Sequence, residues 1–217
     1  MKILLLPSIL MLFWVLHHNL RKNNSKDPQN VSSYLAREDR ANATRRKDLS
    51  DLPYIQVPLN NFPFDITLND QKKQSKIDEY KKIICNLSEV RMLNLIGISN
   101  TELKEAYGPA NLELLTNYDQ CYSRYIRTLW LFADCIYAEY PDKAVEILEY
   151  CLSIGTDISG TYDLLGHYYL DHDKEDQFLA LYDKIPVKDS ISGKVIRNKL
   201  DQIKFSHQQQ TSTEQVP

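Results

Sequence analysis

Few residues of this chain combine a reactive side chain with a spacing that supports chemistry. The sequence contains four cysteines: Cys85, Cys121, Cys135 and Cys151. None follows another at the close spacing of zinc sites or redox pairs, so we expect buried free thiols. His167 has no second metal-binding group at a useful spacing, and Asp171 and Asp173 flank the end of a predicted helix, where carboxylates are commonly solvated. We therefore expect no metal site.

The sequence also lacks the short motifs of common enzymes. It has no phosphate-binding P-loop, no dinucleotide-binding glycine fingerprint, no zinc-protease helix motif and no nucleophile elbow. Only 6 glycines occur in 217 residues, which argues against phosphate-binding loops and against an all-β fold. The net charge is -3 and the globular part has no long basic run, which argues against the binding of nucleic acid. We expect a protein without catalysis, cofactor or small-molecule substrate.

Hydrophobic periodicity predicts helices from residue 69 to residue 205. Apolar residues recur every three or four positions in residues 69–95 and again in residues 110–139. Residues 99–102 have the sequence of a capping box, and Pro141 suits the first turn of another helix. A closing amphipathic helix is predicted from four apolar residues: Val195, Ile196, Leu200 and Ile203. The fold class predicted from the sequence is therefore all-α.

Part of this helical region follows the pattern of a known repeat. The residues that carry the pattern are Ala144, Leu148 and Cys151, then Tyr162, Leu165, Gly166 and Tyr169. They resemble the second helix of one tetratricopeptide repeat and the first helix of the next. The resemblance implies helix-pair units at about residues 125–158 and 159–190, with these residues and Leu131 in their core. The first unit departs from the signature at Thr128, Phe132 and Cys135, and the second has Phe178 in place of a small residue.

The same resemblance implies where a partner would bind. In tetratricopeptide proteins the first helix of each repeat lines the concave face. The candidate partner-binding residues here are Ile126, Leu129, Trp130, Ala133, Asp163 and His167, with Leu164 and Leu170 beside them. This face is apolar with an acidic edge, so we expect an apolar or mildly basic helix or strand of a protein partner. Trp130 is the strongest candidate, and a tryptophan of the core is its alternative.

Residues 51–68 form an extended segment with regularly spaced prolines. Pro53, Pro58 and Pro63 prevent an α-helix, whereas the apolar residues between them are too many for a free linker. We expect the segment to pack back across the repeat helices of its own chain, or to seal one open end of the core.

The N-terminal residues have a different character. Residues 1–20 contain an apolar run that, as a helix of about 30 Å, is long enough to cross a membrane. No small-residue cleavage site follows this run, so we expect a transmembrane anchor; a cleaved signal peptide is the alternative. More basic residues follow the run than precede it, which places the C-terminal domain in the cytoplasm.

Polar segments flank the predicted helical domain. Residues 21–50 read as a charged juxtamembrane linker with one short helix, and residues 206–217 as a disordered tail. The layout resembles a group of membrane-anchored bacterial helical proteins of unassigned activity. The residues that carry this resemblance are 41–48, 99–104 with Tyr107 and Gly108, and 155–159.

These observations predict a binding protein. We expect a membrane-tethered helical-repeat adaptor or scaffold that binds a protein or peptide on its concave helix face. The alternative is an extracytoplasmic, membrane-anchored chaperone-like or envelope-assembly factor with the same fold. The two functions differ in the side of the membrane on which the soluble domain lies.

Overall fold

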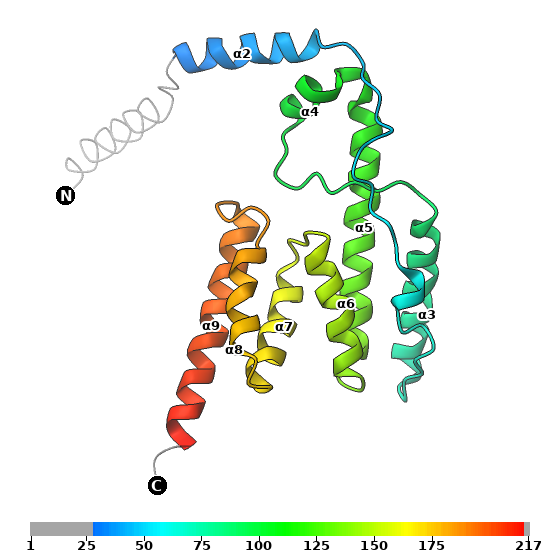
Figure 1. The fold of residues 1–217 in the computed structure, drawn as a ribbon, viewed down its shortest axis with the longest axis vertical. Coiled ribbons are helices and arrows are strands. Elements are labelled where there is room, and N and C mark those ends of the chain that lie inside the picture. The colour runs from blue at the N-terminus through cyan, green and yellow to red at the C-terminus, as the bar shows by residue number, and fades with distance from the viewer. Residues whose placement is uncertain (1–27, 215–217) are drawn as a thin grey trace, which may run out of the picture. The chain divides into compact units, whose positions relative to one another are not determined.

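The fold was analysed in a computed structural model that describes residues 28–214. The predicted all-α fold is confirmed for these residues, which form eight α-helices, three short 3-10 helices and no strand (Figure 1). The chain divides into two compact units. Of the described residues, the first unit contains 28–47 and 100–111, and the second contains 48–99 and 112–214.

In the first unit, two helices are joined by paired charges. Helix α2 spans Pro28–Asn42 and α4 spans Asn100–Tyr107. Arg37 donates from Nε and Nη2 to the two carboxylate oxygens of Glu105, at 2.8 and 2.7 Å. The hydrogen bond from Arg37 holds the pKa of the Glu105 carboxyl below its usual range. Lys104 forms an ion pair with Oε1 of Glu38. The Arg37–Glu105 pair is solvated, so it fixes the register of the helices more than it stabilises them, whereas the side chains of Lys104 and Glu38 are only 16% and 25% exposed.

The buried amide of Asn111 closes this unit. It ends the 3-10 helix η2, Pro109–Asn111, and is 1% exposed. Its Nδ2 donates to the carbonyls of Lys47 and Tyr107, both at 2.8 Å, and its Oδ1 accepts from Arg46 Nε at 3.0 Å. Gly108 has a φ of +86°, and a Cβ there would lie 2.7 Å from the carbonyl oxygen of Arg45. Only glycine fits this approach.

The second unit contains six of the α-helices. They are α3 (Gln71–Ser88), α5 (Leu112–Ile136), α6 (Pro141–Ser153), α7 (Ser159–Asp171), α8 (Glu175–Ala180) and α9 (Ile191–Glu214). The 3-10 helices η1 (Leu59–Asn61) and η3 (Leu181–Lys184) complete it. The side chain of Asp70 accepts from the backbone N–H groups of Lys72 and Lys73 and so begins α3. Pro141 occupies the first turn of α6, as predicted.

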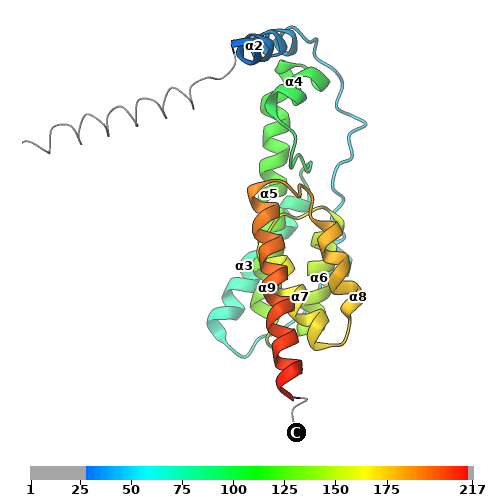
Figure 2. The ribbon, with the colours of Figure 1, turned by 90° about the vertical axis from the view of Figure 1, so that its left-hand side faces the viewer.

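The core of this unit is built around α5. Tyr122, Tyr125 and Phe132 lie on one face of this helix and are completely buried. Helices α3 and α6 pack along α5, and α9 packs along α7 (Figures 1 and 2). The helices α3, α5, α7 and α9 succeed one another from right to left in Figure 1.

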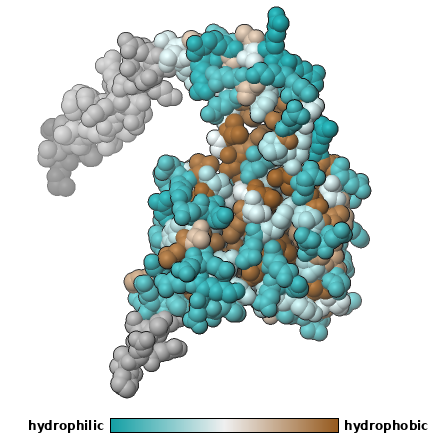
Figure 3. All heavy atoms as spheres, viewed as in Figure 1, coloured by the Kyte–Doolittle hydropathy of each residue, from teal (hydrophilic) through white to brown (hydrophobic). Residues whose placement is uncertain are grey.

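The extended segment, residues 51–68, is part of this core. Phe62 contacts the ring of Tyr150 with centroids 5.4 Å apart, and Phe64 contacts Phe132 at 5.9 Å. The hydroxyl of Tyr150 donates to the carbonyl of Gln56 at 3.1 Å. On the face seen in Figure 3, apolar residues gather in the middle, over α5 and α6. The segment therefore packs on helices of its own chain, which agrees with the expectation from its apolar residues.

Two helices are longer than the sequence predicts. Helix α2 begins at Pro28, within the predicted linker, because proline is well suited to the first turn of a helix. Helix α9 continues to Glu214, through most of the tail predicted to be disordered. No glycine or proline interrupts residues 206–214, so nothing in the local sequence ends the helix.

The structure corrects the predicted localisation. Within residues 28–214, no helix is both long and apolar enough to cross a membrane. The prediction of a single-pass protein of the cell membrane with a cytoplasmic C-terminal domain is contradicted by this finding. The longest described helix, α5, carries charged residues such as Arg127 and Asp134 on its exposed side. The predicted anchor itself, residues 1–20, lies outside the described residues.

The place of the extended segment in the core can be tested by truncating one leucine. Leu68→Ala should lower the free energy of unfolding by about 2–5 kcal/mol, because Leu68 is 5% exposed and its loss leaves a cavity. Leu179→Ala removes the same atoms on α8, where the side chain is 42% exposed, and should change that free energy by about 0.5 kcal/mol or less. Urea denaturation monitored by circular dichroism measures both. Equal losses would show that the segment is not part of the core.

Candidate functional site

The two sides of α5 determine which predicted binding residues reach the surface. Ile126, Leu129 and Ala133 are 3%, 0% and 0% exposed, so these three candidates belong to the core of their own chain. Arg127 and Asp134 are exposed on the opposite side, and Trp130 is partly buried between the two sides. Residues three and four apart share one face of a helix, which places Arg127, Trp130 and Asp134 in one row.

Trp130 lies where α5 meets α7. A Cβ added to Gly160, in the first turn of α7, would lie 2.4 Å from Trp130 Nε1 and 2.5 Å from Cε2. The indole ring therefore packs directly on the backbone of α7, and only glycine leaves room for it. Two turns further along α5 and one turn further along α7, the Tyr137 hydroxyl donates to the carbonyl of Leu164 at 3.5 Å. These contacts form a seam between α5 and α7.

The indole N–H of Trp130 is a buried donor that lacks a partner. No acceptor for Nε1 is present among residues 28–214. Leaving a buried donor unpaired costs about 1–3 kcal/mol, so natural proteins rarely tolerate it without a reason. The ring thus sits at the seam because of its shape, while its polar edge remains unused.

On α7, the other two candidates that the sequence indicated lie beside this seam. Asp163 Oδ2 is 3.2 Å from Lys199 Nζ of α9, and its Oδ1 is 4.0 Å from His167 Nε2. Asp163 is therefore already paired within the chain, whereas the side chain of His167 is 54% exposed. We define the α5–α7 face as Arg127, Trp130 and Asp134 of α5 together with Leu164 and His167 of α7.

The α5–α7 face is not covered by the extended segment. The ring contacts and side-chain hydrogen bonds of residues 51–68 to the helices go to α3, α5 and α6, through residues such as Phe132 and Tyr150. Phe132 lies on the buried side of α5, away from the row of Arg127 and Asp134. The helical region therefore presents one surface that residues 51–68 cover and another that they leave uncovered.

We compared the chain with known proteins at three levels. No family model, characterised protein or solved structure matches it. The candidate site consequently rests on the geometry of these side chains alone.

Further titratable side chains and one surface depression lie elsewhere in the described part of the chain. No group of three or more His, Cys, Asp or Glu side chains there is arranged to hold a metal ion. All four cysteines are free thiols, and complete burial raises the pKa of Cys151 far above its usual range. An open depression of about 740 Å³ lies between the ends of α7 and α9 and the start of α8. Its lining mixes apolar Leu170 and Phe178 with charged side chains such as Lys204.

Tyrosine hydroxyls bound to carboxylates join α6 to α7. Tyr168 donates to Asp142 Oδ1 at 2.6 Å, and Tyr169 donates to Glu149 Oε1 at 2.8 Å. The hydrogen bond to Asp142 raises the pKa of Tyr168 to about 12, because ionisation would place two negative charges together. The ring of His172 stacks on Tyr168 at 4.1 Å. At neutral pH both hydroxyls keep their protons, so these pairs connect the two helices.

The repeat-core residues indicated by the sequence lie mostly inside. Seven of them are buried: Ala144, Leu148, Cys151, Tyr162, Leu165, Gly166 and Tyr169. Leu131 is partly exposed on α5. The sequence analysis missed Arg127 and Asp134, although their spacing from Trp130 was a usable signal. It assigned the partner-binding side of α5 to the row that contains Ile126 and Ala133. That row is offset by one residue from the row that the structure exposes.

The packing of Trp130 can be tested with a single methyl group. In a Trp14→Phe background, Trp130 is the only tryptophan. Gly160→Ala should displace the indole ring toward solvent and move its fluorescence emission to longer wavelength, because the new Cβ overlaps the ring. Ser159→Ala, at the neighbouring position of α7, is the control and should leave the emission unchanged. Unchanged emission in a folded Gly160→Ala protein would contradict the seam.

The pair of Tyr168 and Asp142 gives a pH-dependent prediction. Unfolded tyrosine ionises near pH 10, and folded Tyr168 near pH 12, so its contribution to stability is complete below pH 10 and is lost as pH rises toward 12. Asp142→Asn keeps an acceptor but removes the charge, and should lower the pKa of Tyr168 toward 10. A ¹³C-tyrosine NMR titration, assigned with Tyr168→Phe, measures this pKa. Glu146→Gln, which affects a carboxylate paired with Lys143 on the same helix, is the control.

Proposed function

We propose that this protein is a non-catalytic helical scaffold that binds a peptide segment of another protein on its α5–α7 face. In this proposal the pairs α5–α6 and α7–α8 act as tetratricopeptide-like repeats, and α9 closes their row. The proposed function requires neither a membrane anchor nor a cofactor.

The packing around Gly166 supports the repeat assignment. A Cβ on this glycine would lie 3.1 Å from Ile203 of α9 and 3.4 Å from Phe178 of α8. A small residue at this signature position therefore allows α8 and α9 to approach α7 closely. Phe178, which departs from the repeat pattern, is completely buried and fills the space beside the glycine. The large ring of Phe178 is therefore accommodated because Gly166, next to it, has no side chain.

One observation carries the choice of the binding surface. The extended segment packs at Phe132 and Tyr150 and leaves the row of Arg127, Trp130 and Asp134 uncovered. A face filled permanently by residues 51–68 would have had a structural role only. The α5–α7 face instead presents a partly exposed indole ring between a cationic and an anionic side chain. Aromatic residues flanked by charges are common centres of binding surfaces.

The chemistry of this face defines the partner it fits. Trp130 and Leu164 are partly exposed and offer an apolar contact, and Arg127 and Asp134 lie on either side of Trp130 along α5. A peptide with one apolar or aromatic anchor and charges of both signs around it complements this arrangement. Binding through such an anchor should depend strongly on Trp130 and weakly on the flanking charges.

Site-specific crosslinking in the cells that make the protein tests this proposal. A photoreactive residue is placed at Arg127 on α5, at His167 on α7, and at Glu146, an exposed control position on α6. We expect the first two positions to trap the same protein and the control position not to trap it. A peptide of that protein should then bind the purified chain, and Trp130→Ala should weaken binding by about tenfold or more.

Two results would contradict the proposal. One is capture of the same proteins from Glu146 as from Arg127 and His167, which would show that no particular face is recognised. The other is a captured peptide whose affinity does not change in Trp130→Ala. In that variant, circular dichroism must show the wild-type helix content.

A further inference from the structure

Helix α9 has a second apolar face that its own unit does not use. Its core side holds Ile196, Leu200 and Ile203, which are 0%, 0% and 6% exposed. On the opposite side, Ile191, Val195 and Phe205 are 86%, 50% and 60% exposed. The sequence analysis grouped Val195 with the apolar residues of an amphipathic closing helix, but the structure turns it outward, because Ile196 takes the inward position.

The exposed residues form a continuous stripe along the helix. Residues at spacings of four, three, four and three share one side of an α-helix, the pattern of a helix–helix seam. We call Ile191, Val195, Asn198, Gln202 and Phe205 the α9 stripe. It contains no charged residue, and Asn198 and Gln202 are also exposed. Helix α9 is the last helix of the second unit and lies at its edge (Figure 1).

Such a stripe is unfavourable when it faces water. The outer face of a terminal helix in a helical array is normally polar, because no further helix covers it. Three large apolar side chains in one row mark a surface that contacts another molecule. An α-helix with a matching apolar row is the natural cover for it.

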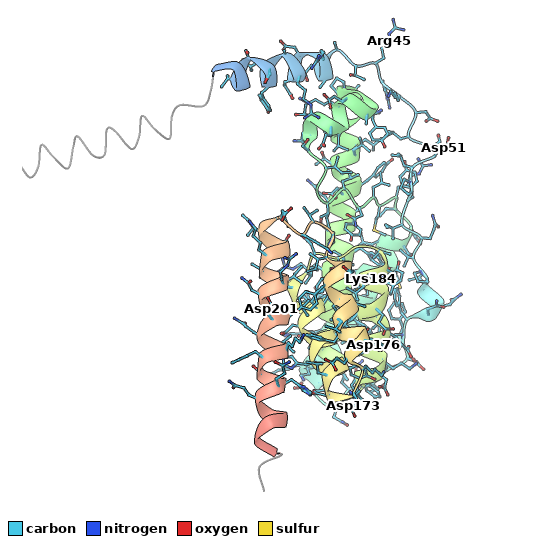
Figure 4. All side chains as sticks on the ribbon, turned by 60° about the vertical axis from the view of Figure 1, so that its left-hand side comes forward. Arg45, Asp51, Asp173, Asp176, Lys184 and Asp201 are labelled. Atoms are coloured by element: carbon cyan, nitrogen blue, oxygen red, sulfur yellow. The ribbon has the colours of Figure 1, made fainter. Side chains whose placement is uncertain are left out.

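The charges beside the stripe indicate which helix covers it. Lys194 and Asp201 are seven residues apart on the same flank, four residues before and three residues after Asn198. Both are exposed, and Asp201 is labelled on α9 in Figure 4. The Tyr182 hydroxyl holds Asp201 in place by donating to its Oδ1 at 2.7 Å. When a second copy of this helix runs antiparallel about Asn198, its Asp201 comes to lie opposite Lys194 of the first copy. The two opposite charges therefore complement a second copy of the same helix.

We propose that the protein forms a two-fold symmetric dimer in which the α9 stripes of two copies pack antiparallel, with the two-fold axis near Asn198. In this register Ile191 lies against the partner's Phe205. Each Lys194 faces the partner's Asp201, and the symmetry produces this ion pair twice. The flanking charges therefore select the antiparallel direction and the register, while the apolar stripe supplies the driving force.

The size of this contact sets the expected strength of the dimer. A single helix from each copy forms an interface at the small end of the range for specific complexes. The dimer should therefore dissociate on dilution, and its dissociation constant is measurable by sedimentation velocity over a concentration series. The proposal concerns α9 only and does not depend on the proposed binding at the α5–α7 face.

Charge reversal tests both the surface and the register. The full chain is compared with Lys194→Glu and Asp201→Lys, each of which replaces the two attractive pairs of the dimer by two repulsive ones. Each single variant should raise the dissociation constant by about tenfold or more. Lys82→Glu, a reversal at an exposed position of α3, is the control and should leave it unchanged.

A mixture of the two single variants provides the decisive measurement. Glu at position 194 of one chain then faces Lys at position 201 of the other, and the native Asp201 and Lys194 face each other, so a heterodimer should form. Val195→Asp places a charge in the stripe itself and should give a monomer. A wild-type chain that stays monomeric at every concentration would overturn the proposal. So would a dimer that persists in both single variants and in Val195→Asp, or single variants that fail to pair with each other.

Discussion

The second unit depends on covering the apolar face of α5 along its whole length. Tyr122, Tyr125, Leu129, Phe132 and Ile136 are all completely buried on a helix of 25 residues. Each large side chain stabilises the folded state by about 1.5–3 kcal/mol when it is fully buried. Helix α6 has only 13 residues and cannot cover such a face alone. Helix α3 and the extended segment therefore complete the cover.

The tyrosines of the chain connect this apolar core to its polar backbone. A buried phenol contributes a large apolar ring, and its hydroxyl needs a hydrogen-bond partner. Tyr122 donates to the carbonyl of Ile154, and the Tyr162 hydroxyl lies 3.0 Å from the carbonyl of Thr156. These carbonyls belong to the turn between α6 and α7, where Gly155 adopts a φ of +85°. Two of the 14 tyrosines of the sequence thus donate to carbonyl acceptors of this turn.

Much of the fold was readable from local sequence, and much of the site was not. Prolines fixed both the extended segment and the start of α6, because proline restricts its own φ angle. The choice between neighbouring rows on α5 depends on which side α3 and α6 occupy, and no local pattern contains that information. For the same reason, the local sequence did not predict that Val195 faces outward, because packing against α7 determines which side of α9 is buried. The localisation was inferred from residues 1–20 and from the basic residues that follow them, and the predicted anchor lies outside the described residues.

The first unit shows a further property of its arrangement in the sequence. Helix α2 pairs with Lys104 and Glu105 of α4, and residues 48–99, which separate the two helices in the sequence, all belong to the second unit. A ribosome therefore releases α2 well before the residues that pair with it, and Arg37 and Glu38 remain solvated during that interval. Contacts between residues so far apart in sequence form late in folding, because a long loop must close first. The first part of the described chain to be synthesised thus belongs to a unit that is completed only when Asn111 has been added.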